Sequence, residues 1–457
     1  MIHRTVHRTL IALMLWGLLA SGPLDARPQD PASPSPPTEL GKFEAGLDGF
    51  MKMLERTAEP LPRVTMASPD GFFEASLPAK AVQPIQRIER IYLLTLEFGP
   101  GPENFAECYV YRDELDVAGS LMSVSKRLFQ ISEQQNGGKI TAKTIHGIDA
   151  GHVGSIPFLT LGWLFRIEEA QGGNSIVGQI KAAMASKEGH SLFCQTETIG
   201  YDGAFFELFR SLVDTVEFSG DPPPEPHYHE ISKIHVSGLN LGFVHITHTM
   251  DKDGDIAIRH HETMLLPVDQ QNLLATDSMK ISYSTVAGDV ISTSKVGAHN
   301  GALVHQLRLS RQDDGTWGVR GSVQGQGFEA NLGNKPLRSP FGQRLEYRDF
   351  TRTAEVGAKL TFDDWLPDVA PGTFSERVLV HRGPDAAGAQ VDLSMGGLSF
   401  ATVLDATMTR RKATMPLSSQ TVHFELLHTE GDVFYPLTLS PPAPSEEPAG
   451  NAPDSSQ

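Results

Sequence analysis

Apolar and polar positions alternate along most of this chain, and this period of two predicts a protein built mainly of β-strands. In the first half the alternation is clearest in three runs, at 71–80, 89–99 and 105–113. A helical period replaces it from 114 to 136 and predicts a helix that buries Leu115, Leu121, Val124, Leu128 and Ile131.

Two later runs, 174–186 and 190–201, are separated by a Lys-Glu-Gly turn and predict a hairpin. The residues that follow, 202–220, predict a final helix and a short closing strand. Strands and helices in this order favour an α+β domain over residues 60–220.

The proline-rich segment 221–226, DPPPEP, is expected to be a stiff linker between two domains. From 227 to 440 the pattern is that of strands separated by Asp-Gly turns, and no helix is expected there. This second domain is predicted to be an all-β antiparallel sandwich or an open barrel.

The ends of the chain follow other patterns. Residues 1–26 combine a basic start with a short apolar run and are expected to be a signal peptide, which makes the protein periplasmic or secreted. A disordered Pro/Ser tether at 27–38 and an amphipathic helix at 39–59 are expected next, and 441–457 is expected to be a disordered tail. No later apolar run is long enough for a transmembrane segment after signal removal.

Two resemblances to known families rest on these segments. The opening strand GFFEASLP, the central helix, the hairpin and the closing helix FFELFRSLVDTVEF resemble the PsbP/Mog1-like α/β sandwich of exported bacterial proteins. The run from Gly238 and Gly242 into a long hairpin resembles the β-rich domain that precedes transglutaminase-like domains in such proteins. The catalytic domain that would follow needs a cysteine, and none occurs after Cys194. The resemblances therefore imply folds and binding modules, and no activity.

Charge and cysteine content indicate which partners and which cell compartment to expect. The formal net charge of -17 argues against a nucleic-acid partner, which requires clustered Lys and Arg. Cys108 and Cys194, the two cysteines of the chain, are expected to form a disulfide in an oxidising compartment. The alternative is a pair of buried free thiols.

The histidine-rich run 243–264, FVHITHTMDKDGDIAIRHHETM, is the main candidate for chemistry. Its Asp-Gly turn predicts a hairpin in which Gly254 is left-handed and His245 lies opposite His261. Alternation then places two histidines on each side of the sheet. The side expected to be apolar carries Val244, Ile246, His248, Met250, Ile256, Ile258, His260 and Glu262.

A zinc site needs three or four protein ligands, so this hairpin cannot complete one alone. The favoured interpretation is cross-strand packing without a metal or other cofactor. We therefore expect a non-catalytic binding or envelope-associated protein, which binds an apolar small molecule or an envelope protein. The alternative is a metal-dependent hydrolase whose ligands are His227, His229, His245 and His261.

Overall fold

The computed structural model describes residues 49–101, 104–112, 116–169, 175–417 and 420–438. The expected signal peptide, tether and C-terminal tail lie outside the described residues, as do residues 39–48 of the expected helix at 39–59. Of its described residues, 49–54 are helical. The structure is mostly β, with large antiparallel sheets. Among the described residues, no helix combines the length and the apolar character needed to cross a bilayer.

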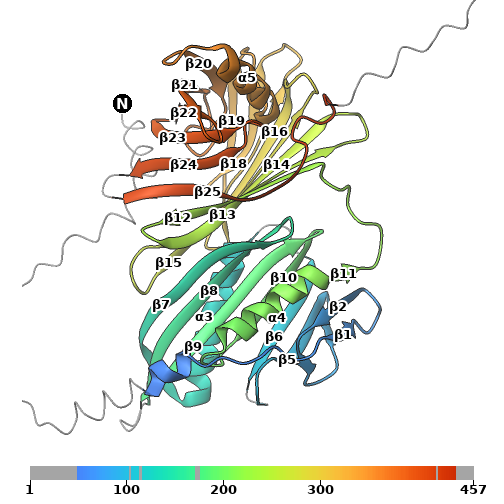
Figure 1. The fold of residues 1–457 in the computed structure, drawn as a ribbon, viewed down its shortest axis with the longest axis vertical. Helices are drawn as coiled ribbons and strands as arrows, with labels where there is room; N and C mark the ends of the chain where they lie inside the picture. The colour runs from blue at the N-terminus through green and yellow to red at the C-terminus, as the bar shows by residue number, and fades with distance from the viewer. Residues whose placement is uncertain (1–48, 102–103, 113–115, 170–174, 418–419, 439–457) are drawn as a thin grey trace, which may run out of the picture.

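Residues 64–218 form a body with two sheets (Figure 1). The smaller sheet has three strands in the order β1-β2-β11, with bounds β1 (Val64–Ala67), β2 (Phe73–Leu77) and β11 (Glu217–Phe218). The larger has eight strands in the order β3-β5-β6-β10-β9-β8-β7, with β4 paired to β5. Its bounds are β3 (Lys80–Ala81), β4 (Gln86–Ile88), β5 (Ile91–Glu97), β6 (Phe105–Arg112), β7 (Gly138–Val153), β8 (Ile156–Glu169), β9 (Ser175–Lys187) and β10 (His190–Thr196).

Helices α3 (Val117–Asn136) and α4 (Asp202–Thr215) cover opposite faces of the eight-stranded sheet. Strand alternation separates the two cores, because Leu159 of β8 packs with α3 whereas its neighbour Phe158 packs with α4. In α3, Leu121 and Leu128 are buried as expected, Val124 and Ile131 are half-buried, and Leu115 lies outside the described residues.

A disulfide joins Cys108 of β6 to Cys194 of β10 inside the α4 core. The two cysteines are direct partners in the strand register, with their Cα atoms 4.1 Å apart.

Residues 228–431 form one continuous antiparallel sheet of fourteen strands, so the two-sheet sandwich expected as one alternative does not form. The order is β19-β18-β17-β16-β15-β14-β13-β12-β25-β24-β23-β22-β21-β20. The bounds are β12 (Tyr228–Val236), β13 (Leu239–Met250), β14 (Ile256–Pro267), β15 (Leu273–Ser284), β16 (Val290–His299), β17 (Ala302–Arg311), β18 (Trp317–Val323), β19 (Gln326–Gly333), β20 (Lys359–Asp364), β21 (Ser375–Asp385), β22 (Gly388–Met395), β23 (Leu398–Asp405), β24 (Arg410–Leu417) and β25 (Gln420–Gly431).

The expectation that 227–440 holds no helix is wrong, because α5 (Pro340–Thr353) interrupts the strands. Ser339 caps this helix by accepting a hydrogen bond from the Gly342 amide, and Pro340 occupies its first turn. The strand-rich sequence on both sides concealed this start signal.

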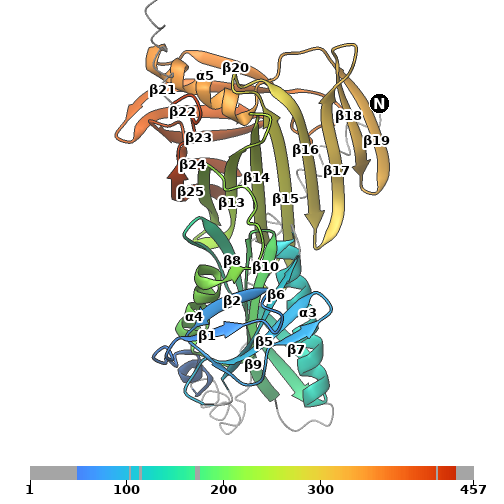
Figure 2. The same ribbon diagram turned by 90° about the vertical axis from the view of Figure 1, so that its right-hand side faces the viewer.

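The fourteen-stranded sheet curls around α5 (Figure 2). Phe341, at the start of α5, packs against Tyr228 and Ile258 in the middle of the sheet. Tyr347, six residues later in α5, packs against Phe362 and Leu379 near the β20 edge of the sheet. Distant strands can meet one short helix only if the sheet bends, so the face that contacts α5 is concave. We call it the inner face.

The loop after β20 closes the curl from the other side. Trp365 in this loop belongs to the same core cluster as Leu307 and Val319 of β17 and β18. Asp368 reaches the inner face of β16 and forms an ion pair with Lys295. The two ends of the sheet are thus joined by side chains from this loop.

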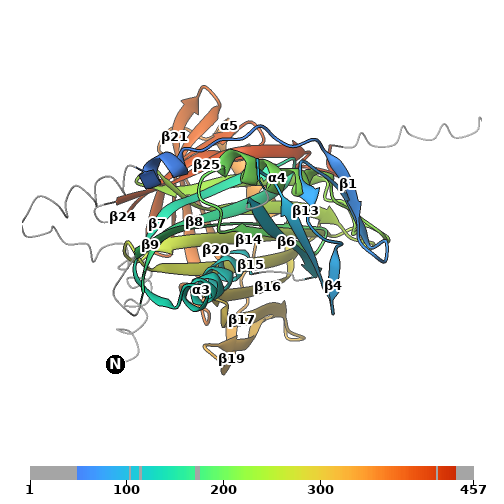
Figure 3. The same ribbon diagram turned by 90° about the horizontal axis from the view of Figure 1, so that it is seen from below.

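The first body covers part of the opposite, outer face, where β7 and α3 lie against β12–β15 (Figure 3). Asp277 of β15 accepts hydrogen bonds from the backbone amides of Ala118 and Gly119, at 3.1 and 3.0 Å. Asn240 of β13 donates to Asp149 of β7 at 2.6 Å. This contact leaves the inner face of the second sheet uncovered by the first body.

Candidate functional site

The histidine-rich hairpin has the predicted register. His245 is paired with His261 and Met250 with Ile256, and the Asp251 amide donates to the Asp255 carbonyl at 2.9 Å. Gly254 is left-handed, with φ of 83°. Alternation and turn chemistry were therefore sufficient to fix this hairpin.

Both faces of the hairpin contain buried side chains. On the inner face, predicted to be the apolar one, Val244, Ile256 and Ile258 are at most 2% exposed, as expected. His260 and Glu262 on the same face differ from the expectation, with 39% and 36% of their side-chain surfaces exposed. The outer face also has buried positions, with Phe243 at 1% and Thr263 at 0% exposure, because β7 and α3 pack on that side.

Three of the four candidate metal ligands lie on the outer face. His229 and His245 stack with 3.4 Å between Nδ1 and Nε2, and His261 is the register partner of His245. His227 lies apart from them, with its ring 6.0 Å from that of His248. Within the described residues, no three His, Cys, Asp or Glu side chains are arranged to hold a metal ion.

The outer row continues through His428 of β25, whose ring stacks on His152 of β7 at 5.0 Å. Burial lowers the pKa of His245 to about 3, with the neighbouring His261 and His229 adding to the effect. Burial also lowers the pKa of His261 to about 4. The His245 and His261 rings are therefore neutral at pH 7 and act as packing groups where the two bodies meet. His152 and His428 are not recognisable from the sequence, because His428 joins the row through the pairing of β25 with β12 and His152 through the packing of the two bodies.

The inner face holds a second, unexpected cluster of charge. The register aligns His260, Lys280 and Lys295 side by side across β14, β15 and β16. We call this row, with Arg410 of β24, the cationic row. Lysines in direct cross-strand pairing repel each other, so Lys280 and Lys295 form an unfavourable pair that packing alone does not explain.

Ion pairs neutralise only part of the charge around this row. Three pairs surround it, namely Arg344–Glu230, Arg377–Asp364 and Lys295–Asp368. Lys280 and Arg410 form no ion pair with any described residue; Lys280 donates only to the Trp365 carbonyl, at 3.5 Å, and Arg410 stacks over Phe424 at 4.9 Å. Glu262 Oε2 lies 3.9 Å from His260 Nε2. With five cations and four carboxylates, this inner region is locally positive in a chain of net charge -17.

The pKa shifts in this region have a common cause. Burial lowers the pKa of Lys280, and burial lowers the pKa of His260 to about 3 with help from Lys295, Arg410 and Lys280. Burial raises the pKa of Glu262. His260 and Glu262 nevertheless keep more than a third of their side-chain surface exposed, so solvent reaches this part of the inner face.

An apolar surface continues the inner face away from the cationic row. Next to Glu262 along β14 come Met264 and Leu266 on the same face, and the register aligns Met264 with Gly242, Ile234 and Phe424. Several apolar side chains on this part of the inner face are only partly buried, namely Ile246, Met264, Leu266, Leu393, Met395, Leu398 and Phe424. We call them the apolar rungs. A concave face that carries apolar rungs in one part and cations without ion pairs in another suits an amphiphilic ligand.

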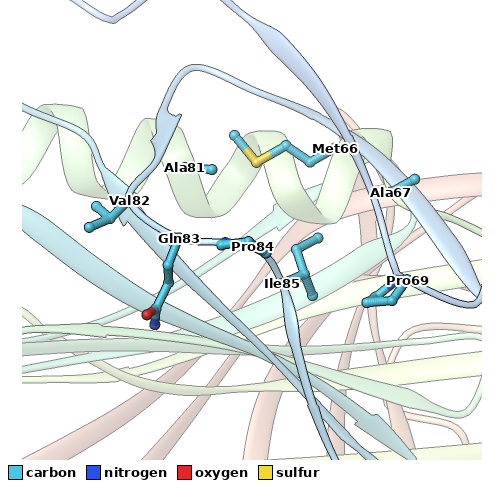
Figure 4. A pocket seen from close by; sticks show the side chains of 8 residues that line it. All are labelled: Met66, Ala67, Pro69, Ala81, Val82, Gln83, Pro84 and Ile85. Carbon is cyan, nitrogen blue, oxygen red and sulfur yellow. The ribbon is translucent and has the colours of Figure 1, made fainter.

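A separate groove of about 560 Å³ lies in the first body, between the end of β1 and the segment 81–85 (Figure 4). Its lining is apolar apart from Gln83, and comprises Met66, Ala67, Pro69, Ala81, Val82, Pro84 and Ile85. Val82 is 56% exposed. The groove brings no charged or nucleophilic group together, and it is a weaker candidate than the inner face.

Comparisons with known proteins add little. No family model matches the chain, and no curated protein matches it. Among solved structures, the chain is similar to a β-barrel-like protein of a domain of unknown function, DUF1849, from Brucella abortus. The identity is 13% and the TM-score 0.35, over 45% of this chain and 98% of that one.

Proposed function

We propose that this protein is an exported, non-catalytic binding protein whose inner face holds an apolar small molecule. The single observation that carries the proposal is the set of apolar rungs, which remain partly exposed on a concave face. Leaving apolar side chains exposed to water costs free energy compared with burying them. Their exposure on a concave face therefore favours a ligand that covers them. Met264 and Met395 add flexible side chains that adapt to ligands of different shape.

The location of the protein and the finer family assignments belong to the same proposal. The basic and apolar pattern of residues 1–26 supports export to the periplasm or out of the cell. The segment order in 60–220 supports a PsbP/Mog1-like module, and the hairpin pattern after 227 supports a relative of the β-rich domain that precedes transglutaminase-like domains.

The test is a titration of purified, delipidated protein with the uncharged fluorophore N-phenyl-1-naphthylamine. We expect saturable fluorescence enhancement, because the dye brightens in apolar surroundings. Met264→Glu, which places a charge on an apolar rung, should abolish it, whereas Thr361→Glu on β20, outside the rungs, should leave it intact. Unsaturable binding, or equal binding to both variants, would contradict the proposal. Elemental analysis of the same sample distinguishes the hydrolase alternative, which requires one stoichiometric zinc or copper.

A further inference from the structure

We infer that the cationic row binds the anionic headgroup of an amphiphile whose apolar chain lies on the apolar rungs. This inference rests on the proposed function and adds the ligand's class, a long-chain carboxylate or phosphate. Lys280 and Arg410 are the headgroup-binding residues, with Lys295 as the third cation beside them.

Electrostatics favours a bound anion beside Lys280 and Arg410. Burial lowers the pKa values of Lys280 and Arg410, so each costs free energy to keep charged. Neither forms an ion pair with any residue that the structure describes, and the Nε atom of Arg410 is buried without a hydrogen-bond partner among them. A bound anion would satisfy both cations and relieve the repulsion between Lys280 and Lys295.

Charged and apolar side chains adjoin on the inner face. Arg410 stacks over Phe424, so a charged headgroup site and an apolar rung touch at this point. From Met264 on β14 to Phe424 on β25 the apolar surface crosses three strand spacings, or about 14 Å. One leaflet of a bilayer has a hydrocarbon depth of roughly 15 Å, so the rungs are long enough for a single acyl chain.

A purely structural role does not explain Lys280 and Arg410. Replacing buried, unpaired charges by apolar residues of similar size is commonly neutral or stabilising. Cations needed only for folding would have carboxylate partners, as Arg344 and Arg377 do with Glu230 and Asp364. The Lys280→Met/Arg410→Met variant should therefore fold, and its melting temperature should equal or exceed that of the wild type.

The experiment compares ligands with the same twelve-carbon chain, namely dodecanoate, dodecyl phosphate and the uncharged monododecanoylglycerol. Displacement of N-phenyl-1-naphthylamine gives each affinity. We expect the anionic ligands to bind about tenfold or more tightly than the uncharged one, since hydrogen bonds to charged groups are the stronger class. The more tightly bound of the two anions identifies carboxylate or phosphate as the natural headgroup.

In Lys280→Met/Arg410→Met the preference for anionic ligands should fall to near unity. The charge-matched control is Arg411→Met/Lys412→Met, whose residues are exposed on β24, and it should keep the preference. Equal binding of charged and uncharged chains by the wild type would overturn the headgroup site while leaving the proposed function standing. An unchanged preference in the first variant would do the same. Failure of the dye and of every twelve-carbon ligand to bind would refute the proposed function itself.

Discussion

Arg344 of α5 and Glu230 of β12 form an ion pair with 2.6 Å between Nη2 and Oε2, at 12% and 3% side-chain exposure. The same guanidinium donates to the Tyr228 hydroxyl at 3.0 Å, and that hydroxyl is 2.8 Å from Thr409 Oγ1. One buried network thus ties the helix inside the curl to the middle of the sheet and to the loop before β24. This network fixes α5 against the inner face of the sheet.

Breaking this pair from one side should be costly. Arg344→Met leaves the Glu230 carboxylate buried without its cation, and we expect the free energy of unfolding to fall by about 3–5 kcal/mol. Denaturant unfolding followed by circular dichroism measures the change.

The double variant Arg344→Met/Glu230→Gln supplies the control, because it removes both charges. It should lose less than the sum of the two single variants, with a coupling free energy between about 0.5 and 3 kcal/mol. Strict additivity would show that the two side chains do not depend on each other.

Stability should decrease as the pH falls below about 6.5, because of the outer histidine row. The pKa values of His245 and His261 are about 3 and about 4 in the folded protein, and an unfolded histidine titrates near 6.5. The unfolded chain therefore binds more protons between these values. The contribution of each histidine to the free energy of unfolding is fully present above the unfolded pKa. It is lost on acidification, by about 2 kcal/mol per histidine between pH 7 and pH 5.

The measurement is the slope of unfolding free energy against pH for the wild type and for His245→Asn, which should have the shallower slope. The comparison of variants is needed because Asp277 acts in the opposite direction. Burial raises the pKa of its carboxyl to about 7, so its contribution is present at low pH and is lost as the pH rises toward 7. Equal slopes would mean that His245 has the same pKa in the folded and the unfolded protein.

The sequence was sufficient wherever local chemistry decides the structure. The hairpin around Gly254 was predicted in full register because an Asp-Gly turn and strict alternation leave one solution. The cationic row was not predicted. Lys280 and Lys295 are direct partners in the β15–β16 pair, but Arg410 of β24 comes near them only through the curl of the sheet. Helix α5 had a recognisable start in Ser339-Pro340, but its apolar positions are few, as expected of a helix that packs partly through the Arg344 network.

Removal of the disulfide should destabilise the first body. Cys108 and Cys194 are separated by 86 positions, and on the chain-entropy account closing such a loop contributes roughly 4 kcal/mol. Cys108→Ala/Cys194→Ala should lower the unfolding free energy by about this amount. Wild-type protein unfolded with and without a reductant is the matched comparison, since it keeps both sulfur atoms in place. A loss below about 1 kcal/mol in both experiments would show that the reduced, unfolded chain is already compact.

The junction between the two bodies depends on Asp277, which accepts from the first amides of α3 and from the Thr263 hydroxyl. Helix α3 has no side-chain hydrogen bond from its own N-cap residue, Asp116, so the cap comes from the other body. Asp277→Ala should therefore cost about 1–2 kcal/mol, the usual value for a lost cap, and should speed hydrogen exchange at the start of α3.

Asp277→Asn separates the role of charge from that of the acceptor. The Asp277 carboxyl has a pKa of about 7, raised first by burial and then by Asp116, so near pH 7 a neutral side chain resembles its protonated form. We expect this variant to lose less stability than Asp277→Ala. Asp253→Ala, at an exposed turn, should change stability by less than about 0.5 kcal/mol and serves as the surface control. If Asn proves as damaging as Ala, the ionised carboxylate and its attraction to the helix N-terminus hold the two bodies together.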